Sequence, residues 1–186
     1  VNSNVITRIM RLPKKDLTLS YRFQGMSKLE YVNISNRKFV DSVGGYVAFN
    51  NCPNLITIDA YNVDFSGLNG NWTRMFASCE KLENINGHED WDTSTANTFG
   101  SMFSDCKSLI SLNLTGWDMS NVLSMDSMFN NCFILTTIGD TFIIPDNVNN
   151  INYMFSEAYN FNFNNITFGK GITQANKWHS ATNNIK

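Results

Sequence analysis

Six phenylalanines recur along this chain at an almost constant spacing, and this repeat limits the possible folds more than any other feature. The intervals between them are 26, 27, 27, 26 and 26 residues. The six are Phe23, Phe49, Phe76, Phe103, Phe129 and Phe155. Such a period is typical of solenoids, in which one repeat cannot bury its apolar side alone and therefore stacks on its neighbours. The repeat predicts one domain with a continuous core.

Other apolar side chains keep the same phase, in steps of three residues. The position three residues after the phenylalanine is occupied in four copies by Cys52, Cys79, Cys106 and Cys132. The next step holds Leu in five copies, and the step after it holds Val, Ile or Leu in five. A step of three fits neither a long amphipathic helix nor a long alternating strand. It predicts a right-handed repeat solenoid, mainly β, with a short helical turn at M-F-x-x-C and a short strand around L-x-x-L-x-L.

Stacked copies should place like side chains in rows along the solenoid axis. We expect Phe76, Phe103 and Phe129 to form one buried row. Residues 90–103 and 116–129 also share W-D-x-S ahead of the next M-F. The Asp and Ser of this pattern can cap the backbone amides of the following turn. The Trp is expected to pack as core at a corner of the coil.

The segment WDMSNVLSMDSMFNNCFILTTI at residues 117–138 resembles the W-D-T-S-N-V-x-x-M-x-x-M-F-x-x-C-x-x-L-x-x-L repeat of BspA-like bacterial surface proteins. This 26-residue class is also found in mycoplasma-type surface lipoproteins and is related to leucine-rich repeats. IIPDNVNNINYMF at 143–155 resembles its sister form, I-P-x-x-V-x-x-I-x-x-x-A-F, with Met154 where Ala is usual. The resemblance covers Tyr21 to Phe168. It implies a leucine-rich-repeat-like stack of about six coils at a cell surface or outside the cell, often associated with adhesion to host proteins or other cells.

The two ends of the chain depart from the repeat. We assign residues 1–20 to an N-terminal cap, with Leu17 and Leu19 covering the first coil. Residues 21–168 form the six-coil solenoid, and residues 169–186 are a polar C-terminal tail or cap. Atypical terminal copies are expected where caps shield the ends of a stack. A start at Val1, without a signal peptide, is typical of a piece excised from a longer protein.

The composition argues against several classes of function. The formal net charge is −2 and the pI is near 5.6, so neither nucleic acid nor an anionic membrane surface is an expected partner. No apolar run is long enough to span a bilayer, and we expect no direct membrane insertion by this fragment. The motifs of serine hydrolases, phosphate-binding loops and zinc proteases are absent from the sequence. We therefore expect no enzyme, no catalytic residue and no cofactor.

The cysteines and His88 are the candidates for metal or redox chemistry. Stacked coils point equivalent Cβ atoms in parallel, whereas a disulfide needs them to converge, so buried free thiols are expected. No C-x-x-C and no paired histidines are present, which argues against a metal site. His88 lies beside Glu89, Asp90 and Asp92 and could belong to a weak cation site or an acid–base cluster. We favour a solvated loop between repeats, because no nucleophile or second ligand stands at a fixed spacing.

A polar position recurs ten residues after the phenylalanine. It holds Asn33, Asp59, Asn86, Asn113, Gly139 and Asn165. Two interpretations remain open: a structural ladder of stacked amides, or a polar binding stripe on the sheet face. The stripe would be flanked by Tyr31, Asn84, Ser111 and Thr137. If the chain binds a ligand, we expect the site on the middle coils, at Asn84, Asn86, Ser111 and Asn113.

The leading hypothesis is a non-enzymatic surface module for adhesion or recognition. It would bind a protein or glycan on a host or neighbouring cell through one solenoid face. The alternative is a virion protein, such as a phage fibre or a receptor-binding or structural repeat module. A spacer that holds other domains apart is a third hypothesis, and an enzyme comes last.

Overall fold

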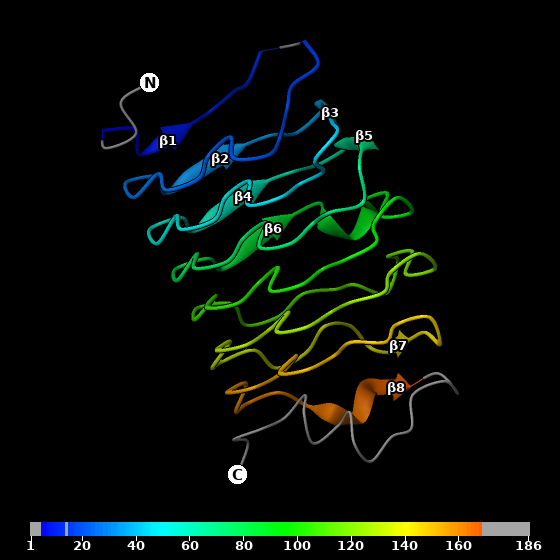
Figure 1. Ribbon diagram of the computed structural model, residues 1–186. Helices are drawn as coiled ribbons and strands as arrows, with labels where there is room; N and C mark the ends of the chain where they lie inside the picture. The colour runs from blue at the N-terminus through cyan, green and yellow to red at the C-terminus, as the bar shows by residue number, and fades with distance from the viewer. Residues whose placement is uncertain (1–4, 14, 169–186) are drawn as a thin grey trace.

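The chain winds into a stack of coils along one axis (Figure 1). The computed structural model describes residues 5–13 and 15–168. We number the coils 1 to 6 by their phenylalanines, so that coil 1 contains Phe23 and coil 6 contains Phe155. This arrangement is the predicted mainly β solenoid of about six coils.

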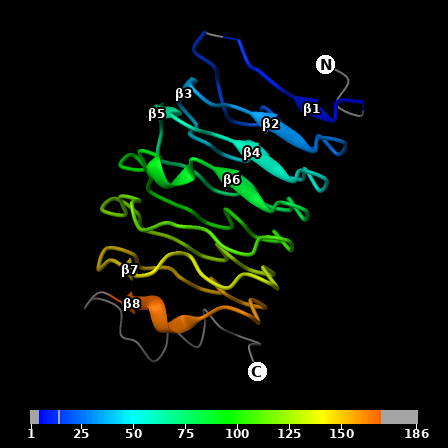
Figure 2. The same cartoon turned by 180° about the vertical axis from the view of Figure 1, so that it is seen from behind.

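The regular strands are short and all pair in parallel. One sheet has the order β1 (Arg8–Ile9), β2 (Tyr31–Asn33), β4 (Thr57–Asp59) and β6 (Asn84–Asn86). A second sheet pairs β3 (Lys38–Asp41) with β5 (Asp64–Leu68), and a third pairs β7 (Phe142–Ile144) with β8 (Ile166–Phe168). Figures 1 and 2 show these two pairs at the end of the coil remote from the four-stranded row. Two 3-10 turns, η1 (His88–Asp90) and η2 (Phe163–Asn165), complete the elements.

The six phenylalanines form one continuous column through the core. Each is at most 3% exposed. Consecutive rings stack with centroids 4.6 to 5.5 Å apart. Offset stacking at this spacing adds to the free energy gained by burying the rings. The predicted buried row of Phe76, Phe103 and Phe129 is confirmed.

The segment around each phenylalanine is a string of turns rather than the predicted helical turn. Ser101 and Asp105, on either side of Phe103, have left-handed φ angles of 53° and 61°, which an α-helix of L-residues does not tolerate. Within the coil, the Cys106 N–H donates to the Phe103 carbonyl over 3.1 Å. The Phe103 N–H instead donates to the Met128 carbonyl of the next coil over 2.9 Å. A non-helical turn therefore stands where a short helical turn was expected, because alternate amides are used to join coils.

The four cysteines lie inside the stack as free thiols, as predicted. Each S–H donates to the carbonyl of the phenylalanine in the preceding coil, over 2.9 to 3.3 Å. Burial raises the pKa of the Cys79, Cys106 and Cys132 thiols. Since the thiolate is the reactive form, these side chains contribute packing and one weak hydrogen bond rather than chemistry.

The W-D-x-S corners also match their prediction. Trp91 and Trp117 are buried and stack with centroids 5.8 Å apart. Asp118 accepts the Ser120 N–H over 2.8 Å, and Asp92 accepts that of Ser94 over 3.0 Å. The corner therefore combines a buried indole with a capped turn.

The N-terminal residues continue the stack. β1 pairs with β2, and Leu17 and Leu19 are buried beside the first coil. The predicted tail at residues 169–186 lies outside the described residues. In the described part of the chain, no helix has the length and apolar character needed to cross a membrane.

Candidate functional site

The parallel hydrogen-bond ladder is interrupted at the junction between coils 3 and 4, where the four-stranded sheet ends at β6. Eleven residues after the phenylalanine, the N–H of Ala60 donates to Asn86 and that of Leu114 to Ile138, each over 2.9 Å. The equivalent N–H of Gly87 has no such bond to coil 4 among the described residues. We call the junction between residues 83–87 and 110–113 the seam.

A second position shows the same interruption. Eight residues after the phenylalanine, the N–H groups of Thr57 and Asn84 donate to the preceding coil over 3.3 and 3.2 Å. The equivalent Ser111 N–H, within the part of the chain that the structure describes, makes no such bond to Glu83. The Ser108 N–H still donates to the Glu80 carbonyl over 3.0 Å, so the coils remain joined beside the seam. The loss of backbone hydrogen bonds is therefore confined to the seam.

One additional residue accounts for the seam. Coil 3 has four residues, 87–90, between Asn86 and Trp91, whereas coil 4 has three, 114–116, between Asn113 and Trp117. The longer segment forms the 3-10 turn η1, which starts after Gly87 in a left-handed conformation with φ 81°. A Cβ on Gly87 would lie 2.8 Å from the Tyr61 Cα, so the close approach of these two coils requires glycine.

His88 occupies the space that η1 opens. Its Nε2 accepts the Asn113 N–H over 3.0 Å, and its Nδ1 lies in hydrogen-bond contact with the Ile85 carbonyl. Because a backbone N–H can only donate and a carbonyl can only accept, Nε2 accepts from Asn113 and Nδ1–H donates to Ile85. The His88 carbonyl in turn accepts the Trp117 Nε1–H over 2.9 Å. The imidazole links the two coils where the backbone ladder does not.

The prediction of a solvated loop holds for part of this segment and is wrong for His88. Glu89 and Asp90 are exposed, whereas the His88 side chain is only 14% exposed. No cluster of three or more metal-ligating side chains occurs within residues 5–13 and 15–168. A cation site or an acid–base cluster at His88 would need several neighbouring carboxylates. Among the described residues, the ion pair recorded for His88 is with Glu89, whose Oε2 lies 3.3 Å from Nδ1.

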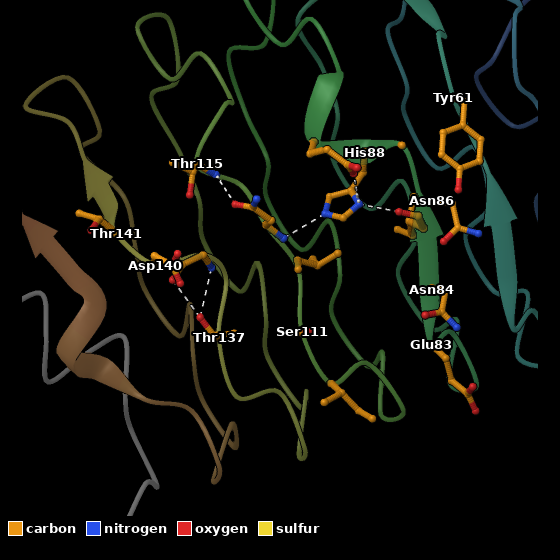
Figure 3. A pocket seen from close by; sticks show the side chains of 17 residues that line it. Tyr61, Glu83, Asn84, Asn86, His88, Ser111, Thr115, Thr137, Asp140 and Thr141 are labelled. Carbon is orange, nitrogen blue, oxygen red and sulfur yellow. Dashed lines mark hydrogen bonds and ion pairs between the residues drawn. The ribbon is translucent and has the colours of Figure 1, made fainter.

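A groove of about 870 Å³ lies over the seam (Figure 3). Seventeen residues of coils 2 to 5 line it: Tyr61, 83–89, 110–113, Thr115, Thr137 and 139–141. Its charged lining residues are Glu83, Glu89 and Asp140, and none of the lining residues is Lys or Arg. The groove therefore combines amide, hydroxyl and carboxylate groups with apolar side chains such as Tyr61 and Ile110, and has no fixed positive charge.

All four residues predicted from the sequence line this groove. The Asn84 and Ser111 side chains are exposed, and no hydrogen bond to another described residue engages them. Asn86 donates to the Asp59 carboxylate over 2.7 Å, and Asn113 caps its own turn by accepting the Thr115 N–H over 3.2 Å. Whether they bind a ligand stays a prediction.

The structure contains one step of the expected polar ladder. Asp59 and Asn86 form a true ladder step between coils 2 and 3. Across the seam, the described residues contain no hydrogen bond between the Asn86 and Asn113 side chains. The side-chain ladder therefore stops at the groove, and the binding stripe stays a prediction.

The sequence matches a family described as "Mycoplasma protein of unknown function, DUF285" over residues 46–169, more than half of the chain. The chain belongs to this family. The match confirms the predicted relation to the mycoplasma-type repeat. None of the curated proteins matches the sequence.

Two solved structures resemble this DUF285 chain. A leucine rich cell surface protein from Faecalibacterium prausnitzii A2-165 aligns with a TM-score of 0.53 and 20% identity, over 88% of this chain and 48% of that one. A leucine rich repeat protein from T. pallidum aligns with a TM-score of 0.47 and 16% identity, over 87% and 80% of the two chains. The first likeness supports the leucine-rich-repeat-like fold. The DUF285 chain spans about half the length of that protein.

Sequence reasoning misses most of the other groove residues of this DUF285 chain, among them His88, Tyr61 and Glu83. The sequence places His88 in a solvated loop and gives no reason to single out Tyr61 or Glu83. One signal was available: the interval of 27 residues between Phe76 and Phe103, with its extra residue between Asn86 and Trp91. An insertion beside a strand predicts a local break in the ladder. It does not predict which side chain turns into the break.

Proposed function

We propose that this chain is a non-enzymatic recognition module of a cell-surface protein. It binds a protein or a glycan through the sheet face of coils 3 to 5. The observation that carries the proposal is the groove over the seam, because it is the place where this face is hollow and lined by polar groups without partners. Concave sites with a few convergent polar groups are the usual form of ligand sites.

The fold supports a binding role. Stacked coils present a rigid surface whose side chains lose little conformational freedom when a partner docks. Asn84 and Ser111 are held at the two edges of the seam by buried neighbours, Ile85 and Leu112. A site on such a scaffold is more precisely positioned than one on a loop.

The proposed location at the cell surface is supported by similarity to a solved structure. The structure from Faecalibacterium prausnitzii is described as a leucine rich cell surface protein, and this chain matches about half of it. We propose that this chain is likewise a module of a larger surface protein.

The test is a binding array of extracellular host proteins and glycans, probed with the wild-type chain and two double variants. Ser111→Arg with Asn113→Arg fills the groove. Ser120→Arg with Leu123→Arg is the matched control, since both residues are exposed in coil 4 and lie outside the groove lining. The control adds the same charge to the same coil.

Loss of a bound partner in the groove variant, with binding retained in the control and melting temperatures unchanged, supports the proposal. Equal binding by all three proteins, or loss in the control alone, places the binding surface elsewhere and overturns it.

A further inference from the structure

Four residues that line the groove carry backbone groups whose counterparts are hydrogen-bonded at the junctions between coils 1 and 3. On the donor side these are the N–H groups of Gly87, whose counterparts Ala60 and Leu114 donate across their junctions, and of Ser111, whose counterparts Thr57 and Asn84 do so. Among the described residues, the equivalent Thr137 N–H of coil 5 makes no such bond either. On the acceptor side these are the carbonyls of Glu83 and Asn113. Their counterparts Ile56 and Asn86 accept from the neighbouring coil. None of the four has a partner among the described residues.

This set of groups selects a ligand by its hydrogen-bonding character. Backbone donors and acceptors that lie in a groove are normally paired with water or with a ligand. An ammonium or guanidinium group only donates, and so cannot satisfy the two N–H groups. A carboxylate or sulfate only accepts, and so cannot satisfy the two carbonyls. A hydroxyl does both, and a group of neighbouring hydroxyls matches the mixed floor.

The negative charge of the lining residues is a separate argument against anionic ligands. Glu83, Glu89 and Asp140 are all exposed, and no lining residue is cationic. An anionic ligand would meet three carboxylates without a compensating charge. Sialylated and sulfated sugars are therefore disfavoured.

The groove also offers apolar surface. Tyr61 and Ile110 line it and are 50% and 55% exposed, although both are large apolar side chains. They come from coils 2 and 4, and so lie on either side of coil 3. A pyranose ring carries C–H groups on its faces and hydroxyls on its edges, and so can use both kinds of surface at once.

We infer that the groove over the seam binds a neutral saccharide unit of a glycan. Its hydroxyls pair with the unsatisfied backbone groups of Glu83, Gly87, Ser111 and Asn113, and with the side chains of Asn84 and Ser111. The inference rests on the proposed function and narrows its partner to one chemical class.

The experiment titrates the full chain with four kinds of probe. These are neutral oligosaccharides built from hexoses, N-acetylhexosamines and deoxyhexoses; sialylated oligosaccharides; sulfated oligosaccharides; and an oligo-lysine peptide. Amide resonances report the site directly. We expect one or more neutral saccharides to shift the Gly87 and Ser111 amide signals, and binding to change little with salt because no charge is neutralised.

Two variants test the seam itself. Ser111→Arg with Asn113→Arg should weaken binding of that saccharide by about tenfold or more, roughly 1.4 kcal/mol or more. In the second variant, residues 87–90 are replaced by Gly-Thr-Gly, which keeps Gly87, removes the extra residue and closes the seam. It should lose binding to the same extent while keeping the fold, as judged by its melting temperature.

The outcomes separate this inference from the proposed function. No binding of any neutral saccharide overturns the inference. Binding of only anionic sugars or oligo-lysine also overturns it, and leaves the proposed function standing if the Arg variant abolishes that binding. Saccharide binding that survives both variants overturns the inference, because the site is then not the seam, and contradicts the proposed function as well.

Discussion

The junction between coils 3 and 4 and the junction between coils 4 and 5 have the same core and different surfaces. The Phe76–Phe103 and Phe103–Phe129 ring pairs stack at 5.4 and 5.5 Å. On the sheet face, Leu112 and Leu114 donate to coil 5 over 3.1 and 2.9 Å, whereas one imidazole replaces the direct ladder at the seam. The backbone hydrogen bonds on the sheet face therefore differ between the two junctions, while the ring stacking in the core is the same.

The difference shows how a repeat protein can acquire a site without losing its stack. One residue added at a corner is absorbed by a 3-10 turn, and the core column keeps its spacing. The cost is a few backbone hydrogen bonds, which the half-buried His88 partly replaces. Nearest-neighbour packing makes such a change local, because each coil contacts only the coils beside it.

The largest effect should come from the core, and it should be the same at both junctions. Phe103→Ala and Phe129→Ala should each lower the free energy of unfolding by about 3–5 kcal/mol, since each removes a fully buried ring from mid-stack. Urea denaturation measures both. A cost below about 1 kcal/mol for Phe103 would mean that the column is not the core.

The next effect should appear only at the seam. His88→Ala leaves the Asn113 N–H and the Ile85 carbonyl without their side-chain partner, and should cost about 1–3 kcal/mol. Glu89→Ala is the control. Its carboxylate is 49% exposed and its pairing with His88 should contribute at most about 1 kcal/mol. If both variants lose the same small amount, the imidazole does not hold the junction.

A smaller and uniform effect is expected for the thiols. Cys106→Ala removes an S–H bond across the seam junction and Cys132→Ala removes its counterpart across the regular junction, over 3.3 and 3.1 Å. Each should cost about 1 kcal/mol. In thiol titration without reductant, the folded protein should be unreactive and four thiols should appear after denaturation. A count below four would reveal a disulfide, and unequal costs would show that the seam extends into the core.

The stack could be predicted from the sequence because it depends on the period of the apolar side chains. The seam could not, because it depends on hydrogen bonds between neighbouring coils. Apolar side chains at a fixed period must face a common interior, so the phenylalanine, cysteine and tryptophan positions follow from the spacing. The helical turn expected at M-F-x-x-C depends instead on backbone bonds to the next coil, which no local pattern shows. His88 depends on how a single extra residue is absorbed. Asn84, Asn86, Ser111 and Asn113 could be placed on one face from the repeat alone, whereas their groove required the structure.

Amide hydrogen exchange tests the central claim most directly, because it compares equivalent positions within one molecule. Gly87 should exchange about tenfold or more faster than Ala60 and Leu114, and Ser111 should exchange faster than Thr57 and Asn84 by a similar factor. Asn113, bonded to His88, should be protected in the wild type and lose protection in His88→Ala. Equal protection of Gly87, Ala60 and Leu114 would show that the ladder is continuous, and would contradict the seam.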